Sequence, residues 1–177
     1  LPVILCLDRA GITGPDGASH HGVLDLTMCL RVPGMTIFAP SCYEELGVMF
    51  ESALEIEDGP VALRWSRGSA PRSPDGQVGS GRSARKLVDG SDVCILSVGT
   101  QLTASLEAAE ELSGQGVSAS VWDVRTVPLD RAMLRDAAGH QLVATVEDGM
   151  RVGGVGSLVG DELSRMPAET HRPRTLN

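Results

Sequence analysis

Residues 8–22 carry the densest group of potentially reactive side chains in the chain, DRAGITGPDGASHHG. An arginine can anchor an anionic group, and an imidazole, which titrates near neutral pH, can accept or release a proton. The four glycines let the backbone approach a ligand closely or adopt positive φ. The residues therefore indicate a small-molecule site with a positive anchor and a proton-transfer histidine. A polar surface loop with a satisfied Asp–His pair has the same composition and stays an alternative.

The elements around this loop favour a site. The apolar run at residues 3–7 precedes it and reads as a strand buried on both faces. Ligands bind at the carboxyl ends of strands in open parallel sheets. A second arginine, Arg67, follows another predicted strand at residues 61–65. Arg9 and Arg67 are therefore expected to reach one crevice, although they are 58 positions apart.

Short apolar runs alternate with longer amphipathic segments along the chain, which is typical of parallel sheets with helical crossovers. Ser41, with Glu44 three residues later, predicts a capping box at the start of one helix. The remaining predicted strands span residues 35–39, 83–88 (an edge strand), 93–98, 117–121 and 142–146. The predicted helices span residues 23–32, 42–56, 100–112, 129–138 and 156–166.

A stretch rich in Gly, Ser and Pro at residues 66–82 divides this pattern and is typical of a linker. The predicted fold class is α/β, with two consecutive parallel-sheet units. The expected boundaries are 1–67 for the first unit, 68–82 for the linker and 83–177 for the second. The chain starts inside a strand and stops after residues 175–177 without a closing element, so we expect it to be part of a longer polypeptide.

Composition excludes several classes of protein. The net charge is −8, with one lysine and no basic run, which does not suit a nucleic-acid-binding protein. No apolar stretch reaches the roughly 18 residues of a membrane span. The four cysteines form no CxxC pair or zinc spacing, so no metal site is predicted; Cys6 and Cys94 lie in apolar runs and are expected to be buried. This cysteine usage fits the cytoplasm.

Other polar residues are interpreted as structural. His21 is expected to point away from His20 on an extended loop, and His140 and His171 to lie on the surface. Asp25 is expected to cap or orient the loop, and Arg64 to form an ion pair. The stretch GGVG at residues 153–156 could be taken for a dinucleotide fingerprint, but it lacks the full spacing and favours a tight strand-to-helix turn.

The string DRAGITGPDGASHHGVLDL resembles the pyrimidine-domain loop of 1-deoxy-D-xylulose-5-phosphate synthases, which are transketolase-like enzymes. The similarity continues through VPGM, APS, DGP and RWSRG, and through VEDG and GGVGS in the second unit. It implies thiamine diphosphate and Mg²⁺ as cofactors, pyruvate and glyceraldehyde 3-phosphate as substrates, and a homodimer. It also implies that the regions that hold the cofactors lie outside this chain.

The resemblance assigns roles to four residues. His20 and Asp16 match catalytic residues, and Arg9 and Arg67 match the arginines that bind the phosphate of glyceraldehyde 3-phosphate. Ser66 stands where the family usually has proline, which would loosen Arg67. Two alternatives stay open: an inactive domain pair that serves dimer or interdomain contacts, and another transketolase-superfamily member. The corresponding loops of transketolases and 2-oxoacid dehydrogenase β-subunits read differently.

Overall fold

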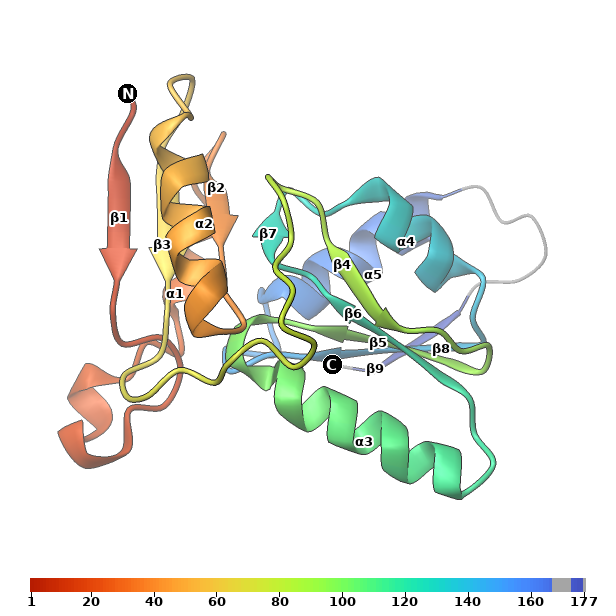
Figure 1. The fold of residues 1–177 in the computed structure, drawn as a ribbon. Coiled ribbons are helices and arrows are strands. Elements are labelled where there is room, and N and C mark those ends of the chain that lie inside the picture. The colour runs from red at the N-terminus through yellow and green to blue at the C-terminus, as the bar shows by residue number, and fades with distance from the viewer. Residues whose placement is uncertain (167–172, 177) are drawn as a thin grey trace.

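Two α/β units lie side by side in the computed structural model, which describes residues 1–166 and 173–176 (Figure 1). Each unit has its own sheet, with helices packed against it. The predicted fold class is therefore confirmed. Both sheets are mostly parallel, but each contains one antiparallel strand at an edge.

The first sheet has the order β1-β3-β2-β7. β1 (Ile4–Leu7), β2 (Thr36–Phe38) and β3 (Val61–Arg64) are parallel, and β3 in the centre is buried along its whole length. Helix α1 (Asp25–Cys29) follows the glycine-rich loop, and α2 (Tyr43–Leu54) packs on β3. The apolar contacts of this unit centre on five buried residues, Phe38, Met49, Ala53, Val61 and Leu63.

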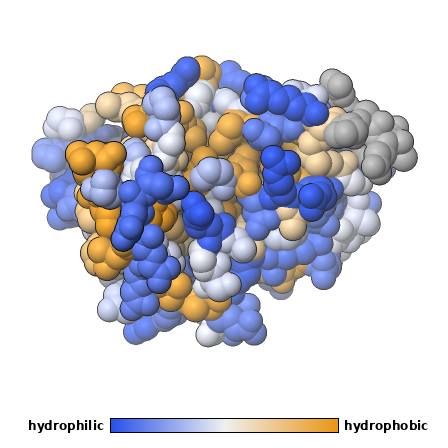
Figure 2. Space-filling view, turned by 90° about the horizontal axis from the view of Figure 1, so that it is seen from above, coloured by the Kyte–Doolittle hydropathy of each residue, from blue (hydrophilic) through white to orange (hydrophobic). Residues whose placement is uncertain are grey.

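The expectation that the first strand is buried on both faces is wrong. Within the described chain β1 pairs only with β3, so it forms an edge of the sheet. Leu5 is 42% exposed, and Cys6 is exposed rather than buried. Hydrophobic side chains also reach the surface elsewhere on this unit, and Figure 2 shows them between hydrophilic ones on the left of the molecule.

The second sheet has the order β4-β6-β5-β8-β9. Its strands are β4 (Arg85–Val88), β5 (Val93–Ser97), β6 (Ala119–Asp123), β8 (Leu142–Val146) and β9 (Arg174–Leu176). Only β4 is antiparallel to its neighbour, at the edge where an edge strand was predicted. β9 corrects the expectation that no further element follows Pro173, because it pairs in parallel with β8; Asn177 lies outside the described residues.

Helices cover both faces of the second sheet (Figure 1). α3 (Leu102–Gly114) packs on β5 and β6, while α4 (Arg131–Ala138) and α5 (Val155–Arg165) pack together on the opposite side. Cys94, predicted to be buried, is fully buried there. None of the helices in the described ranges has the length and apolar character of a membrane span.

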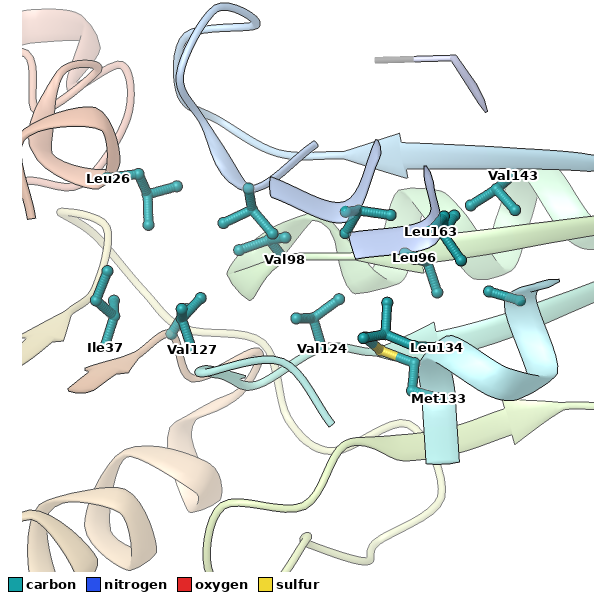
Figure 3. Packing of buried hydrophobic residues seen from close by; sticks show 14 of the residues in the cluster. Leu26, Ile37, Leu96, Val98, Val124, Val127, Met133, Leu134, Val143 and Leu163 are labelled. Atoms are coloured by element: carbon teal, nitrogen blue, oxygen red, sulfur yellow. The ribbon is translucent and has the colours of Figure 1, made fainter. Parts of the chain in front are cut away.

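One hydrophobic core joins the two units (Figure 3). It runs from Leu26 and Ile37 in the first unit through Val124 and Val127 to Met133 in α4. The two-residue strand β7 (Thr126–Val127) reinforces this junction, because it leaves the second unit and pairs antiparallel with β2. The units are therefore packed as one body rather than joined only by a linker.

The segment between the units is held down by a buried ion pair. Residues 65–84 contain no helix or strand. Arg125 Nη2 lies 2.7 Å from Glu45 Oε2, and both side chains are fully buried. Arg125 directly precedes β7 and Glu45 lies in α2, so the pair links the second unit to the first. Glu45 accepts a hydrogen bond from the backbone N–H of Gly79, and Arg125 donates to the carbonyl of Ser83. The linker thus wraps around the ion pair.

Two further expectations need correction. Ser41 does not cap α2, whose N-cap is Cys42; its hydroxyl donates instead to Asp123 Oδ2 at 2.6 Å, across the junction between the units. His140 is buried rather than on the surface, and its ring nitrogens contact the Asp136 carbonyl and the Ser120 hydroxyl. His171 lies outside the described residues.

Candidate active site at the carboxyl end of the first sheet

The glycine-rich loop is built onto the ends of two neighbouring strands. β1 and β3 end in register at Leu7 and Arg64, and the pairing continues as Ala10 N–H donates to the Trp65 carbonyl at 3.0 Å. Both loop arginines therefore start from the same rim of the sheet, as predicted. Two short 3₁₀ turns, Gly14–Asp16 and Ala18–His20, then fold the loop back on itself. Gly17 joins them with φ of 82°, a conformation that glycine adopts without strain.

One carboxylate brings the two arginines together. Asp16 Oδ2 lies 2.9 Å from Arg9 Nε and also 2.9 Å from Arg67 Nε. The Asp16 side chain is 16% exposed, whereas those of Arg9 and Arg67 are 43% and 47% exposed. The two arginines therefore converge on one carboxylate, and about half of each side chain stays exposed. The departure at Ser66 does not prevent this contact.

The charges at this site stabilise one another. The hydrogen bond from Arg9, with the nearby charge of Arg67, lowers the pKa of Asp16 although its partial burial acts in the opposite direction. Asp16 in turn raises the pKa of Arg9, chiefly through the same hydrogen bond. Asp16 is therefore ionised at neutral pH. Asp8 also lies 3.4 Å from Arg9 Nη1, so two carboxylates face the two guanidinium groups, and the N–H groups of the arginines that remain unpaired are the part of the cluster that suits an anion.

His20 is oriented by the backbone of the same loop. Its Nδ1 lies 2.9 Å from the carbonyl oxygen of Asp16, and the Ser19 hydroxyl lies 3.2 Å from the same nitrogen. A carbonyl oxygen can only accept, so this contact assigns a proton to Nδ1, and Nε2 is the ring nitrogen left for contact with a ligand. The structure thus places His20 beside Asp16, the residue on which Arg9 and Arg67 converge.

Buried charges below the loop hold it in place. Arg64, 3% exposed at the end of β3, donates from Nε to Asp25 Oδ2 at 2.9 Å and from Nη2 to Asp148 Oδ1 at 2.7 Å. Burial disfavours its charge, but the two carboxylates outweigh that effect and raise the pKa of Arg64. The predicted ion-pair role of Arg64 is confirmed. Asp25 also accepts from the Leu26 N–H at the start of α1, in agreement with its structural interpretation.

Sequence reasoning missed Asp148, which belongs to the second unit. It lies in the turn between β8 and α5, and no local signal connects it with a strand end 84 positions away. The neighbouring glycine stretch is a strand-to-helix turn, as predicted: the carboxylate of Glu147 accepts from the N–H groups of Val155 and Gly156 at the start of α5. A carboxylate of the protein therefore occupies the position at which a dinucleotide fingerprint would bind phosphate.

A metal site of the kind implied by Mg²⁺ needs oxygen ligands, preferably carboxylates. Among the described residues, the one group of three metal-binding side chains consists of Cys94, Asp136 and His140. Burial raises the pKa of the Cys94 thiol to about 12, so it stays protonated. The Asp136 carboxylate accepts hydrogen bonds from Trp122 and Lys86. This cluster does not fit Mg²⁺. At the candidate active site, the carboxylate of Asp16 is already paired with the cations Arg9 and Arg67, so it does not fit a metal ion either.

Two families of known domains match the chain. The transketolase pyrimidine binding domain matches residues 1–72, and the transketolase C-terminal domain matches residues 82–174. A 1-deoxy-D-xylulose-5-phosphate synthase of Magnetococcus marinus is 45% identical over 174 residues, which cover 95% of this chain and 27% of that protein. The 1-deoxy-D-xylulose-5-phosphate synthase 2 of Kitasatospora griseola is 42% identical over 171 residues, which cover 92% of this chain and 27% of that protein.

Solved structures show the same architecture. A chain described as "Split gene transketolase, inactive beta4 tetramer" superposes with a TM-score of 0.82 at 33% identity, and covers 98% of this chain and 57% of that one. A transketolase of Campylobacter jejuni shares the fold, with a TM-score of 0.68 at 23% identity. The superposition covers 82% of this chain and 24% of that one. The chain spans 27% of the length of the synthases named above. The chain therefore belongs to the transketolase family, within which it resembles 1-deoxy-D-xylulose-5-phosphate synthases and carries sequence of both the pyrimidine-binding and the C-terminal domain.

Proposed function

We propose that this chain forms the acceptor-binding and proton-handling part of a 1-deoxy-D-xylulose-5-phosphate synthase, a thiamine-diphosphate-dependent transferase. In this reaction pyruvate loses carbon dioxide and its remaining two-carbon unit condenses with glyceraldehyde 3-phosphate. Support comes from the names of the relatives and from the transketolase domains that match. By the same resemblance, thiamine diphosphate and Mg²⁺ are bound largely by regions of the intact enzyme that lie outside this chain.

The observation that carries the proposal is the convergence of Arg9 and Arg67 on Asp16. A guanidinium group presents paired, permanently charged donors that match phosphate geometry. Both side chains are about half exposed, so their free N–H groups can bind the phosphate of glyceraldehyde 3-phosphate. Asp16 holds the two cations together in the absence of that phosphate, and its carboxylate can accept hydrogen bonds from the hydroxyl groups of the acceptor.

His20 supplies the proton chemistry of the proposal. Its Nδ1 is engaged with the Asp16 carbonyl, so Nε2 exchanges protons with the acceptor carbonyl and with the two-carbon unit. Thiamine diphosphate, when bound, supplies the electron sink for the decarboxylation. The residues of this chain anchor the acceptor, orient its carbonyl and move the proton.

Replacement of Arg67 tests the phosphate assignment in the holoenzyme. Loss of a charge-assisted hydrogen bond costs about 1.5–3 kcal/mol, so Arg67→Ala should raise KM for glyceraldehyde 3-phosphate roughly 10- to 150-fold. KM for pyruvate should change less than about twofold, because pyruvate has no phosphate. Arg72→Ala is the matched control, because Arg72 is 79% exposed and pairs with Glu44 instead. Equal changes in both KM values would refute the assignment.

A second candidate is an inactive homo-oligomer formed by these two domains alone. It is favoured by the similar structure whose description names an inactive tetramer of a transketolase chain. Both candidates predict no tight binding of thiamine diphosphate and Mg²⁺ to this chain alone. A synthase assay of the chain supplied with the missing cofactor-binding regions distinguishes them, since turnover there would contradict an inactive pair. For the intact enzyme we propose a cytoplasmic homodimer; all four cysteines are free, which fits a reducing compartment.

A further inference from the structure

The loop that carries Arg9, Asp16 and His20 rests on the second unit of the molecule. Gly11, in the first part of the loop, is buried and has φ of 68°. A side chain at this position would collide with the Asp148 carboxylate, since a Cβ atom on Gly11 would lie 2.5 Å from Asp148 Oδ2. The loop backbone therefore lies directly against Asp148, and glycine is required there both for its conformation and for the space.

The same carboxylate is joined to the other end of the loop through Arg64. Arg64 Nη2 donates to Asp148, and Arg64 Nε donates to Asp25, which begins α1 where the loop ends. Gly22 N–H donates to the carbonyl of Gly11 at 2.9 Å and closes the base of the loop. Asp148 thus lies directly against Gly11 at the start of the loop. It is joined to Asp25, at the end of the loop, through the buried guanidinium of Arg64.

Asp148 is itself rigidly placed by the second unit. The preceding residue, Glu147, caps α5 through two backbone N–H groups. The glycines that follow pack tightly against α1: a Cβ atom on Gly149 would lie 3.3 Å from Leu26, and one on Gly153 would lie 3.1 Å from Thr27. The second sheet and α5 therefore fix the position of Asp148, and Asp148 fixes the position of the loop that lies against it.

We propose that Asp148 is a positioning residue of the acceptor site, through which the C-terminal domain fixes the loop that presents Arg9, Asp16 and His20. The inference rests on the proposed function for its kinetic consequence, but the loop anchoring itself does not depend on it. Asp148 does not touch the reacting atoms. It fixes where the base of the loop sits, and a displacement of about 1 Å at a reacting group can cost on the order of a hundredfold in rate.

The experiment compares Asp148→Ala with Asp130→Ala in the holoenzyme. Asp130 belongs to the same domain and accepts hydrogen bonds from Ala132 and Met133 at the start of α4, so its loss lowers stability without touching the loop. Two properties are measured for each variant: amide hydrogen exchange of residues 9–22, and KM for glyceraldehyde 3-phosphate and for pyruvate. Asp148→Asn is a third variant, which keeps the shape and an oxygen for Arg64 but removes the charge.

Asp148→Ala is expected to speed exchange of the loop amides and to raise KM for glyceraldehyde 3-phosphate about tenfold or more. The pyruvate KM should stay within about twofold, and Asp148→Asn should restore part of the loss. Asp130→Ala should lower the melting temperature with neither effect. Loop exchange that responds to Asp148→Ala no more than to Asp130→Ala would overturn the proposal. Faster loop exchange with an unchanged acceptor KM would support the anchoring of the loop by Asp148 and overturn the proposed phosphate-binding role of Arg9.

Discussion

A buried carboxyl group at the junction of the two units makes stability depend on pH. Asp123 is fully buried at the end of β6, and burial raises its pKa from 3.8 to about 7. The Ser41 hydroxyl donates to its Oδ2, which favours the ionised form, but Oδ1 has no partner among the described residues. An ionised Asp123 would thus keep one carboxylate oxygen buried without compensation, at a high cost.

The direction of the effect follows from the two pKa values. Unfolded Asp123 releases its proton near pH 3.8, whereas the folded protein keeps it until about pH 7. Between these values the folded state binds a proton that the unfolded state has lost, so the stability from this group is fully present below about pH 4 and is lost as pH rises through 7. A pKa difference of about 3 units corresponds to about 4 kcal/mol.

Asp123→Asn removes this dependence, because the amide has nearly the same shape and does not ionise. The free energy of unfolding of the variant should therefore increase relative to that of the parent by about 3 kcal/mol between pH 4.5 and 8, which makes the variant the more stable of the two at high pH. Urea unfolding can be followed by the fluorescence of Trp65 and Trp122, one in each unit. Asp161→Asn, at a half-exposed acid that pairs with Arg165, is the control. A difference between Asp123→Asn and the parent that stays constant with pH would refute the reasoning.

Two other substitutions test the buried ion pair and the proton-transfer residue. Glu45→Gln leaves the buried Arg125 without a counter-charge and should cost about 3–5 kcal/mol of unfolding free energy, whereas Glu44→Gln, at a partly exposed pair with Arg72, should cost less than about 1 kcal/mol. Chemical denaturation measures both, and equal losses would contradict the role of burial. His20→Ala should lower kcat about 10²–10⁴-fold in the holoenzyme, while His21→Ala should leave kcat within a few-fold; an unchanged rate for His20→Ala would remove it from the mechanism.

Local patterns in the sequence were sufficient to predict which side chains meet at the carboxyl ends of the strands. The rule that parallel strands present their carboxyl ends at one rim predicted that Arg9 and Arg67 meet, and the structure brings them to the same carboxylate. The positions of Asp16 and His20 followed from the same loop. Their roles in catalysis stay predictions, because geometry alone does not measure turnover.

The errors concern contacts made between elements far apart in the chain. The apolar run around Cys6 has the composition of a central strand, but exposure depends on which strand forms the edge of the sheet. Ser41 has the sequence context of a helix cap, yet a carboxylate 82 positions away takes its hydroxyl. For His140, one hydrogen-bond partner is local, the carbonyl of Asp136, but the other is the hydroxyl of Ser120, 20 positions away in β6. Asp148 was missed for the same reason.

The short strand β7 has a consequence for any attempt to produce the first unit alone. Thr126 and Val127 pair with the edge of β2 that faces away from β3. They come from a part of the chain beyond residue 72, where the match to the pyrimidine binding domain ends. A polypeptide cut between the two matched domains would expose that row of unpaired amides and carbonyls beside apolar side chains. Exposed strand edges of this kind recruit other chains. Such a truncated product should therefore self-associate, and a peptide that carries Thr126 and Val127 should suppress the aggregation.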